Sequence, residues 1–293
     1  MARIAIIGPG AVGGIVAAWL HQTGRHEVLV CARRAFQELC VDTPAGVLRS
    51  RPTVLDTPVA ASPVDWVLVA TKAYDAAGAS AWFPRLVAPA TRVAILQNGV
   101  EHCERFATSV APDQLLPVMV DLPGERSAPG VIRQRAPGRM LAPDGESGRA
   151  FVGLFAATII DAALTADFRT AVWRKLCHNS AGVLNALLLQ PAGVFRDEAV
   201  ADLARAVVRE CAAVGRAEGA ALPEDIADTV IQAYRAGPAD GVNSLHADRA
   251  AGRPMELDAR NGVIVRLGRR HGIPTPCNQM AVTLLETLAR PTA

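Results

Sequence analysis

The sequence predicts an α/β protein in which an N-terminal doubly wound parallel sheet is followed by an all-α C-terminal domain. Three observations lead to this prediction. Short apolar runs alternate with helical segments in the N-terminal half, a glycine-rich turn joins the first run to the first helix, and the C-terminal part shows mostly helical spacing. The chain has 293 residues, too many for one ordinary core and about right for two domains.

The first segments form a βαβ unit. Residues Arg3–Ile7 are a short, β-branched apolar run bounded by glycine, which predicts a buried strand. Residues Ala11–Gln22 predict a helix that ends at Gly24, and His26–Cys31 is a second apolar strand. This order of strand, glycine turn, helix and strand is a βαβ unit.

Further strands follow the same pattern. Residues Trp66–Ala70 and Arg92–Leu96 are continuous apolar runs, as strands covered on both faces must be. From Pro117 to Pro143 proline and glycine become frequent and short runs such as Val131–Gln134 lie between turns. We interpret this stretch as antiparallel strands at the edge of the sheet.

The chain after Asp167 is mostly helical. The predicted helices are Phe168–Leu189, Glu198–Glu218, Leu257–His271 and Gln279–Leu288. We therefore place the domain boundary near residue 165, with residues 1–165 as the sheet domain and residues 166–293 as a helical domain for substrate binding and dimerisation.

Composition excludes several classes of protein. Hydrophobic residues make up 51% and charged residues 20%, which excludes a disordered chain. The net charge of +2 comes from charges spread along the sequence, so no nucleic-acid partner is expected. No apolar run approaches the roughly 20 residues that span a bilayer, and no signal peptide is present. We expect no membrane association and a cytoplasmic location.

The six cysteines are widely spaced and form no C-x-x-C pair, so they predict reduced thiols rather than a zinc or redox site. No cluster of His, Asp and Glu has the spacing of metal ligands, and no metal is expected.

The glycine-rich turn is the strongest motif. It reads Gly8-Pro9-Gly10-Ala11-Val12-Gly13, which is G-x-G-x-x-G between a predicted strand and a predicted helix. In such a motif Gly8 permits the tight turn, Gly10 lets the backbone approach a pyrophosphate, and Gly13 allows close packing of helix on strand. The helix N-terminus attracts the phosphates. The motif predicts a Rossmann domain that binds a dinucleotide; a glycine turn without ligand is the alternative.

The end of the second strand indicates which dinucleotide binds. An NAD site usually places Asp or Glu there to accept a hydrogen bond from the ribose. This strand instead ends with Arg33 and Arg34, whose guanidinium groups suit forked contact with a 2′-phosphate. The sequence therefore favours NADP(H) over NAD(H), unless both arginines are only solvated surface charges.

Further motifs recur along nearly the whole chain in a specific order. They are Thr71-Lys72-Ala73, Gln97-Asn98-Gly99-Val100, Trp173-Arg174-Lys175-Leu176 with Asn179, Ser244 with Asp248, Glu256-Leu257-Asp258 with Asn261-Gly262, and His271-Gly272-Ile273-Pro274. Together these motifs resemble the ketopantoate reductase (2-dehydropantoate 2-reductase) family. The resemblance implies NADPH-dependent reduction of a small 2-oxo acid to a 2-hydroxy acid, above all ketopantoate to pantoate, in pantothenate biosynthesis.

The resemblance also implies roles for residues at the cofactor. The family's arginine at the position of Arg33 meets the 2′-phosphate. The positions that match Lys72 and Asn98 lie by the nicotinamide end of the cofactor, and Glu256 matches a residue that contacts the cofactor.

On the substrate side, the resemblance implies that Lys175 is catalytic and donates the proton to the forming alkoxide, and that Asn98, Asn179 and Ser244 bind the substrate. The residues agree with this reading. Hydride addition leaves negative charge on the carbonyl oxygen, where a lysine is both cation and proton donor. Lys175 and Asn179 are four residues apart and therefore share one helix face. A surface lysine is the alternative for Lys175, and a plain Asn-Gly turn is the alternative for Asn98.

Two departures from the family pattern concern the substrate. A second asparagine, four residues beyond the first, is replaced by Val183, and Asn185 lies about 200° around the helix from it. A polar stretch before the edge strands reads Val118-Met119-Val120. We expect both changes to make the pocket more apolar, and the loss of one hydrogen bond costs on the order of 1–3 kcal/mol.

Three readings of function therefore stay open. The first is reduction of ketopantoate. The second is NADP-dependent reduction of a less polar keto acid or ketone, and the third is a non-catalytic NADP(H) sensor. His178 and His271 are interpreted as residues without a catalytic role. Apolar faces on the helical domain favour a homodimer.

Overall fold

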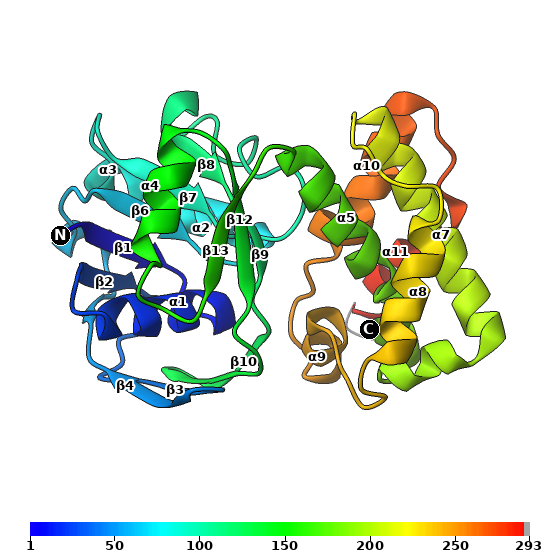
Figure 1. Cartoon of the computed structure of the whole chain (residues 1–293), viewed down its shortest axis with the longest axis horizontal. Coiled ribbons are helices and arrows are strands. Elements are labelled where there is room, and N and C mark those ends of the chain that lie inside the picture. Colours follow the sequence, from blue (N-terminus) through cyan, green and yellow to red (C-terminus); the bar gives the residue numbers. More distant parts are fainter. Residues whose placement is uncertain (290–293) are drawn as a thin grey trace. The chain divides into compact units, whose positions relative to one another are not determined.

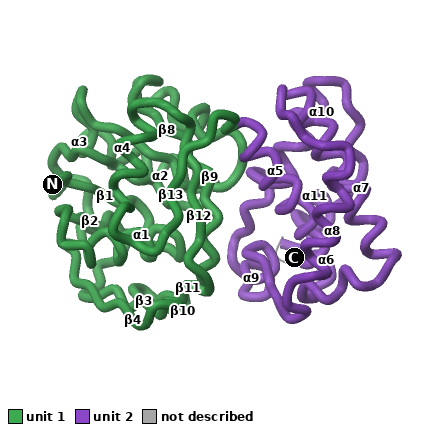
Figure 2. The backbone as a smooth tube through the Cα atoms, viewed as in Figure 1, with its two compact units in different colours: residues 1–168 green, residues 169–293 purple. Residues whose placement is uncertain are grey.

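The structure is a computed structural model that describes residues 1–289. The chain divides into two compact units, residues 1–168 and residues 169–293 (Figure 2). The first unit combines strands with helices, and the second consists of helices (Figure 1). The predicted class, an α/β domain followed by a helical one, is confirmed.

The centre of the first unit is a six-stranded parallel sheet with the strand order β5-β2-β1-β6-β7-β8. Its strands are β1 (Arg3–Ile7), β2 (Glu27–Cys31), β5 (Thr53–Leu55), β6 (Trp66–Val69), β7 (Arg92–Ile95) and β8 (Leu115–Pro117). The order extends outward from β1 in both directions, which is the doubly wound arrangement. Carboxyl ends of β1, β6 and β7 therefore lie side by side at one edge.

Both faces of this sheet are buried, which explains why its strands are continuous apolar runs. Successive residues of β1 alternate between two apolar clusters, with Ile4 in one and Ala5 in the other. Helices α1 (Ala11–Gln22) and α4 (Glu146–Leu154) supply the first cluster, and α2 (Ala76–Ser80) and α3 (Phe83–Leu86) supply the second. Helices thus cover the sheet on both sides.

The stretch from Pro117 to Pro143 corrects one expectation. Its strands do not lie at the edge of the main sheet, because they build two separate sheets. One has the order β10-β11-β3-β4 and the other the order β13-β12-β9. The strands are β3 (Leu39–Thr43), β4 (Gly46–Ser50), β9 (Met119–Asp121), β10 (Gly124–Ala128), β11 (Val131–Gln134), β12 (Arg139–Pro143) and β13 (Asp161–Thr165).

Pairing in these small sheets is mixed. Strand β10 pairs with β11 antiparallel and β9 with β12 antiparallel, whereas β11–β3 and β12–β13 are parallel pairs. The sequence missed β3 and β4, which form an antiparallel hairpin directly after the βαβ unit. Strand β3 buries only every second residue and β4 is mostly exposed, so neither has the continuous apolar run of a strand covered on both faces.

The second unit is built from seven α-helices within the described residues. They are α5 (Phe168–Ala181), α6 (Val183–Leu188), α7 (Glu198–Ala217), α8 (Ile226–Ala236), α9 (Ser244–Ala250), α10 (Val263–His271) and α11 (Pro276–Leu288). A π-helical turn, Asp258–Gly262, leads into α10. A 3₁₀ turn at Ala192–Arg196 precedes α7, and the first unit has three more 3₁₀ turns, at Pro58–Ala60, Ala73–Asp75 and Pro112–Gln114.

Two predicted helices are interrupted. The segment expected as one helix over Phe168–Leu189 breaks at Gly182 into α5 and α6. A Cβ atom at Gly182 would lie 2.6 Å from Nδ2 of Asn243, so this position needs glycine for the close approach of that side chain. The segment expected over Leu257–His271 begins with the π-helical turn instead.

In the core of the second unit, the Sγ atoms of Cys177 on α5 and Cys211 on α7 lie 3.6 Å apart. Both side chains are fully buried, and burial raises the pKa of the Cys211 thiol. The six cysteines of the chain are free thiols. None of the helices described is long and apolar enough to cross a membrane.

Candidate active site

The glycine-rich loop connects β1 to α1 and has the geometry of a phosphate cradle. Gly8 has φ +90°, and its amide donates a 3.1 Å hydrogen bond to the carbonyl of Cys31 on β2. A Cβ atom at Gly13 would lie 2.2 Å from the carbonyl oxygen of Gly8. The two glycines are therefore fixed by packing.

The space above Gly10 is open. A Cβ atom there would meet nothing within 4 Å. Helix α1 begins at the next residue, and no side chain caps its N-terminus. The first amides of α1 thus lack a side-chain cap, and the N-terminus of such a helix attracts the phosphates of a ligand. Pro9, Ala11 and Val12 complete the loop, and these residues fit a dinucleotide.

The residues after β2 carry positive charge. The Arg33 side chain is 92% exposed, and its Nη1 lies 4.0 Å from a carboxylate oxygen of Asp75. Arg34 is exposed as well. An exposed ion pair at this distance contributes little free energy, so Arg33 can exchange Asp75 for a better anion.

Lys72 and Asn98 follow the carboxyl ends of β6 and β7, and both are half-buried. Gln97, which is 3% exposed, links the two loops that carry Lys72 and Asn98. Its Nε2 donates to the hydroxyl of Thr71 at 3.0 Å and to the carbonyl of Lys72 at 3.3 Å. Arg105 donates to the carbonyl of Asn98 at 3.0 Å. The structure therefore brings the glycine loop, Lys72 and Asn98 to one edge of the sheet, as open α/β sheets do at their ligand sites.

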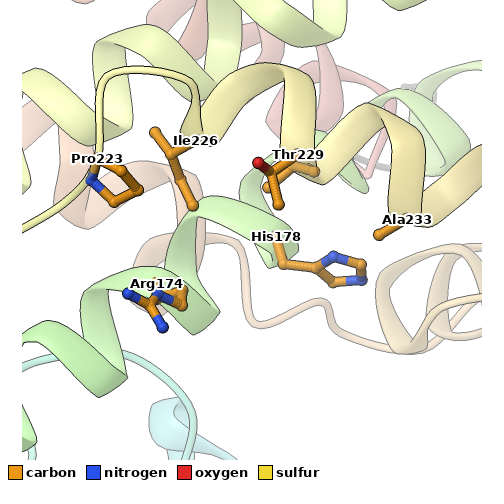
Figure 3. Close-up of a pocket in the computed structure, with 7 residues that line it drawn as sticks. Arg174, His178, Pro223, Ile226, Thr229 and Ala233 are labelled. Carbon is orange, nitrogen blue, oxygen red and sulfur yellow. The ribbon is translucent and has the colours of Figure 1, made fainter.

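Helix α5 presents Lys175 and Asn179, both half-buried, on one face of the second unit. On the neighbouring face, Arg174 and His178 line a pocket of about 240 Å³ together with residues of α8 (Figure 3). The two faces are about 100° apart around the helix. The His178 ring stacks on Tyr234 with centroids 4.5 Å apart. His178 therefore serves packing against α8.

Asn243 fixes the beginning of α9, where Ser244 lies exposed. Its Oδ1 accepts from the amide of His246 at 3.0 Å. Its Nδ2 donates to the carbonyl of Gly182 at 2.9 Å and to Oδ1 of buried Asn185 at 3.0 Å. Asn185 thus anchors α9.

Arg260, on the π-helical turn, contacts both α5 and the beginning of α9. It is 2% exposed, its Nη2 donates to the carbonyl of Asn179, and its Nη1 lies 3.5 Å from Oγ of Ser244. Glu256 is buried, and its charge acts on the Arg260 guanidinium. The structure therefore brings Asn179, Ser244 and Glu256 together around Arg260, one helical turn from Lys175.

Asn261, from the family motif, is a fully buried structural residue. Its Nδ2 donates to the carbonyl of Ser180 at 3.1 Å and to Oδ1 of Asn278 at 2.9 Å. His271, a further motif residue, pairs with Glu218 at the end of α10. Among the described residues, no group of His, Cys, Asp and Glu side chains could hold a metal ion.

The apolar departures lie in the core rather than in an open pocket. Val118 and Val120 belong to the main apolar cluster of the first unit, and Val183 has no exposed surface. The expectation that the first two make a substrate pocket more apolar is therefore wrong. Their burial gives the stretch a role in packing.

Sequence reasoning missed Arg260, Asn243 and Gln97. Arg260 had a detectable signal, because it replaces an apolar residue on the stripe of Leu257 and Ile264. Asn243 precedes a helix as an N-cap residue. Gln97 opens the family motif Gln97-Asn98-Gly99-Val100, but nothing in the sequence assigned it a role of its own.

Two family models match this chain. The model described as Ketopantoate reductase PanE/ApbA matches residues 4–146, and the model described as Ketopantoate reductase PanE/ApbA C terminal matches residues 167–289. A curated protein of Caulobacter vibrioides named 2-dehydropantoate 2-reductase is 55% identical over 289 residues, which cover 99% of this chain and 100% of that protein.

Solved structures agree with the family models. A PanE/ApbA family ketopantoate reductase from Ralstonia eutropha is 31% identical with a TM-score of 0.90, covering 98% of each chain. A dimeric ketopantoate reductase from Staphylococcus aureus is 24% identical with a TM-score of 0.87, covering 97% of this chain and 98% of that one. D-mandelate dehydrogenase with NADH and anilino(oxo)acetate is 21% identical with a TM-score of 0.89, covering 98% of each chain. The last two share the fold alone.

Proposed function

The chain belongs to the ketopantoate reductase family, and from that premise we propose that it reduces 2-dehydropantoate (ketopantoate) to pantoate with NADPH. It is an oxidoreductase, like the relatives it matches. The observation that carries the choice of substrate is the 55% identity, over the full length, with a protein named 2-dehydropantoate 2-reductase.

We propose NADPH as the cofactor, bound at the glycine loop of residues 8–13. The support is local: Gly10 is open to a phosphate, and two exposed arginines without an acidic residue follow β2. D-mandelate dehydrogenase, which shares the fold, is known with NADH. Arg33 and Arg34 distinguish this chain's site by their fit to a 2′-phosphate. Lys72, Asn98 and Glu256 are assigned to cofactor contacts.

In the proposed reaction, bound NADPH supplies the hydride. Lys175 holds its ammonium at the carbonyl oxygen, stabilises the charge that develops there and gives it a proton. Asn98, Asn179 and Ser244 orient the polar groups of the substrate by hydrogen bonds.

The test is an NADPH oxidation assay at 340 nm with purified protein, ketopantoate and a panel of other 2-oxo acids and ketones. We expect kcat/KM for ketopantoate of about 10⁴ M⁻¹s⁻¹ or more. Lys175→Ala should lower kcat by about 10²–10⁴-fold and leave the Kd of NADPH unchanged. Arg174→Ala, which removes the preceding cation on the neighbouring helix face, is the matched control and should keep turnover.

Each alternative has its own outcome. Turnover only on a less polar member of the panel would identify a different reductase. Tight NADPH binding without turnover on any of them would indicate a sensor. Equal turnover of wild type and Lys175→Ala would remove Lys175 from the mechanism.

We propose further that the chain acts as a homodimer in the cytoplasm. A structurally similar ketopantoate reductase is dimeric. Met280, Leu284 and Leu288 form an exposed apolar stripe on α11, which suits a second copy of the chain. Light scattering of the purified protein measures its mass, and a monomeric mass would contradict the dimer.

A further inference from the structure

The helical unit contains a buried cation that the proposed reaction has not used. Arg260 lies on the π-helical turn with 2% of its surface exposed. Its Nη2 donates to the carbonyl of Asn179 and its Nη1 approaches the hydroxyl of Ser244, but Nε has no hydrogen-bond partner. A buried arginine normally completes its hydrogen bonds, so an unpartnered Nε requires an explanation.

Its charge is not compensated by a direct partner either. Within the described residues, the hydrogen bonds of its guanidinium go to a carbonyl and a hydroxyl, and none goes to a carboxylate. Burial lowers the pKa of Arg260, while electrostatic interactions with Tyr234, Glu256 and Asp248 raise it. An arginine stays protonated under these conditions. A buried charge without an ion pair is costly unless an anion joins it.

Arg249 provides a comparison within the same unit. It is half-buried, and its Nη1 donates to the carbonyls of Ala186 and Leu187 at the end of α6. This is the ordinary role of a cation at a helix C-terminus. Arg260 does the same for α5 with Nη2 alone, and its Nη1 is directed to Ser244 instead.

We propose that Arg260 determines specificity for acids by acting through Ser244 on the carboxylate of the substrate. This inference rests on the proposed function. The Ser244 hydroxyl can accept from Nη1 of Arg260 and donate its own proton to a carboxylate oxygen at the same time. The buried positive charge strengthens this chain of hydrogen bonds and stabilises the bound anion. Arg260 is thus a positioning residue that makes the helical unit select a 2-oxo acid over a neutral ketone.

The test compares a charged with a neutral ligand. Pantoate and its neutral lactone serve as inhibitors of ketopantoate reduction. In Arg260→Met, we expect KM for ketopantoate and the Ki of pantoate to rise about 100-fold. The Ki of the lactone should change by no more than about twofold, and the Kd of NADPH likewise. Arg260→Lys should recover part of the loss, because it restores the charge without the fork.

Arg249→Met is the matched control. It removes a structural arginine of the same unit and should lower the melting temperature without changing the preference for acid over lactone. If Arg260→Met weakens both inhibitors equally, or neither, the inference is wrong. Should Arg260→Met fail to fold, Arg260→Lys is measured in its place. Because lysine lacks the forked guanidinium, we expect Arg260→Lys to raise the Ki of pantoate and to lower the preference for acid over lactone. If neither quantity changes, the inference is wrong.

The two proposals fail in different ways. Wild-type protein that binds NADPH but reduces no 2-oxo acid refutes the proposed function. Wild-type protein that reduces ketopantoate, with an Arg260→Met variant of the same selectivity, refutes only the role of Arg260.

Discussion

The glycine loop of the first unit and the polar cluster around Arg260 in the second unit differ in the groups that they offer to a ligand and in how these groups are held. The loop is a single segment of six residues, Gly8 to Gly13, and offers backbone amides at the start of α1. The cluster is assembled from α5, α9 and the π-helical turn, which are far apart in the sequence. It offers side chains whose charges and hydrogen bonds depend on one another.

This difference has a physical consequence. A backbone site tolerates most side chains but requires glycine where atoms come close, so its constraint is steric. A side-chain site tolerates backbone variation but requires each buried polar group to keep its partners, so its constraint is electrostatic. Substitutions in the two regions should therefore fail for different reasons.

Substitution of the loop glycines should give the largest effect and separate folding from binding. Gly13→Ala places a Cβ atom 2.2 Å from the Gly8 carbonyl oxygen and 3.0 Å from Cβ of Ala70. We expect a loss of about 1–3 kcal/mol in the free energy of unfolding, together with loss of NADPH binding. Denaturant unfolding and fluorescence titration with NADPH measure the two quantities.

Gly10→Ala is the matched partner of that variant. Its φ of −74° is open to alanine, and its Cβ atom would meet nothing in the protein. The free energy of unfolding should stay within about 1 kcal/mol of wild type, since only chain entropy changes. NADPH affinity should fall by at least about tenfold, because the methyl group occupies the approach of the diphosphate. Unchanged affinity would contradict the cradle.

Arg33→Ala tests a side chain of the first unit that we expect to determine cofactor preference. The variant removes the proposed forked contact with the 2′-phosphate, and we expect NADPH affinity to fall by about 10–100-fold. NADH affinity should hardly change. Arg34→Ala, measured beside it, shows how much the second guanidinium contributes to the same preference. Equal losses for both cofactors in Arg33→Ala would exclude the 2′-phosphate contact.

Glu218→Gln, in the second unit, should have the smallest effect, a small loss in the free energy of unfolding. Burial raises the pKa of Glu218, but hydrogen bonds from His271 and Arg270 outweigh burial and hold this pKa below the usual value of 4.5. A lowered pKa means that the carboxylate stabilises the fold above about pH 4.5 and loses this contribution as the pH falls through the folded value. With 22% exposure, less than about 1 kcal/mol is expected at pH 7.

Unfolding experiments at pH 7 and pH 3.5 check this sign. Wild type should be more stable than Glu218→Gln at pH 7, and the difference should shrink at pH 3.5. A difference that grows toward acid would show that the carboxylate does not stabilise the unit.

The sequence predicted the parts of the molecule that depend on local patterns. The βαβ unit, the glycine loop and the helical second domain follow from apolar periodicity and from glycine spacing, and the structure has them. The strands β9 to β12 were placed wrongly, because pairing between strands depends on partners distant in sequence. Gly182 interrupts a predicted helix because the side chain of Asn243, from another segment, needs its space.

The candidate site divides in the same way. Lys175 and Asn179 could be placed on one face by helical spacing, and family resemblance supplied their roles. The apolar stripe of Leu257 and Ile264 could have indicated that Arg260 is buried, but not which groups surround its guanidinium, because these come from distant segments of the folded chain. Val118 and Val120 show the converse: a change of residue type was visible, but not that both side chains are in the core.

Because Cys177 and Cys211 are buried against each other, the rate at which they react with a thiol reagent reports how often the helical unit opens. A thiol reagent reaches these sulfur atoms only when α5 and α7 separate, and a raised pKa slows the reaction of Cys211 further. In the first unit Cys31 is sealed in β2 with its pKa raised to about 12 by burial. Mass spectrometry of alkylated peptides can therefore time the opening of each unit separately in one sample, with and without cofactor, without an introduced label.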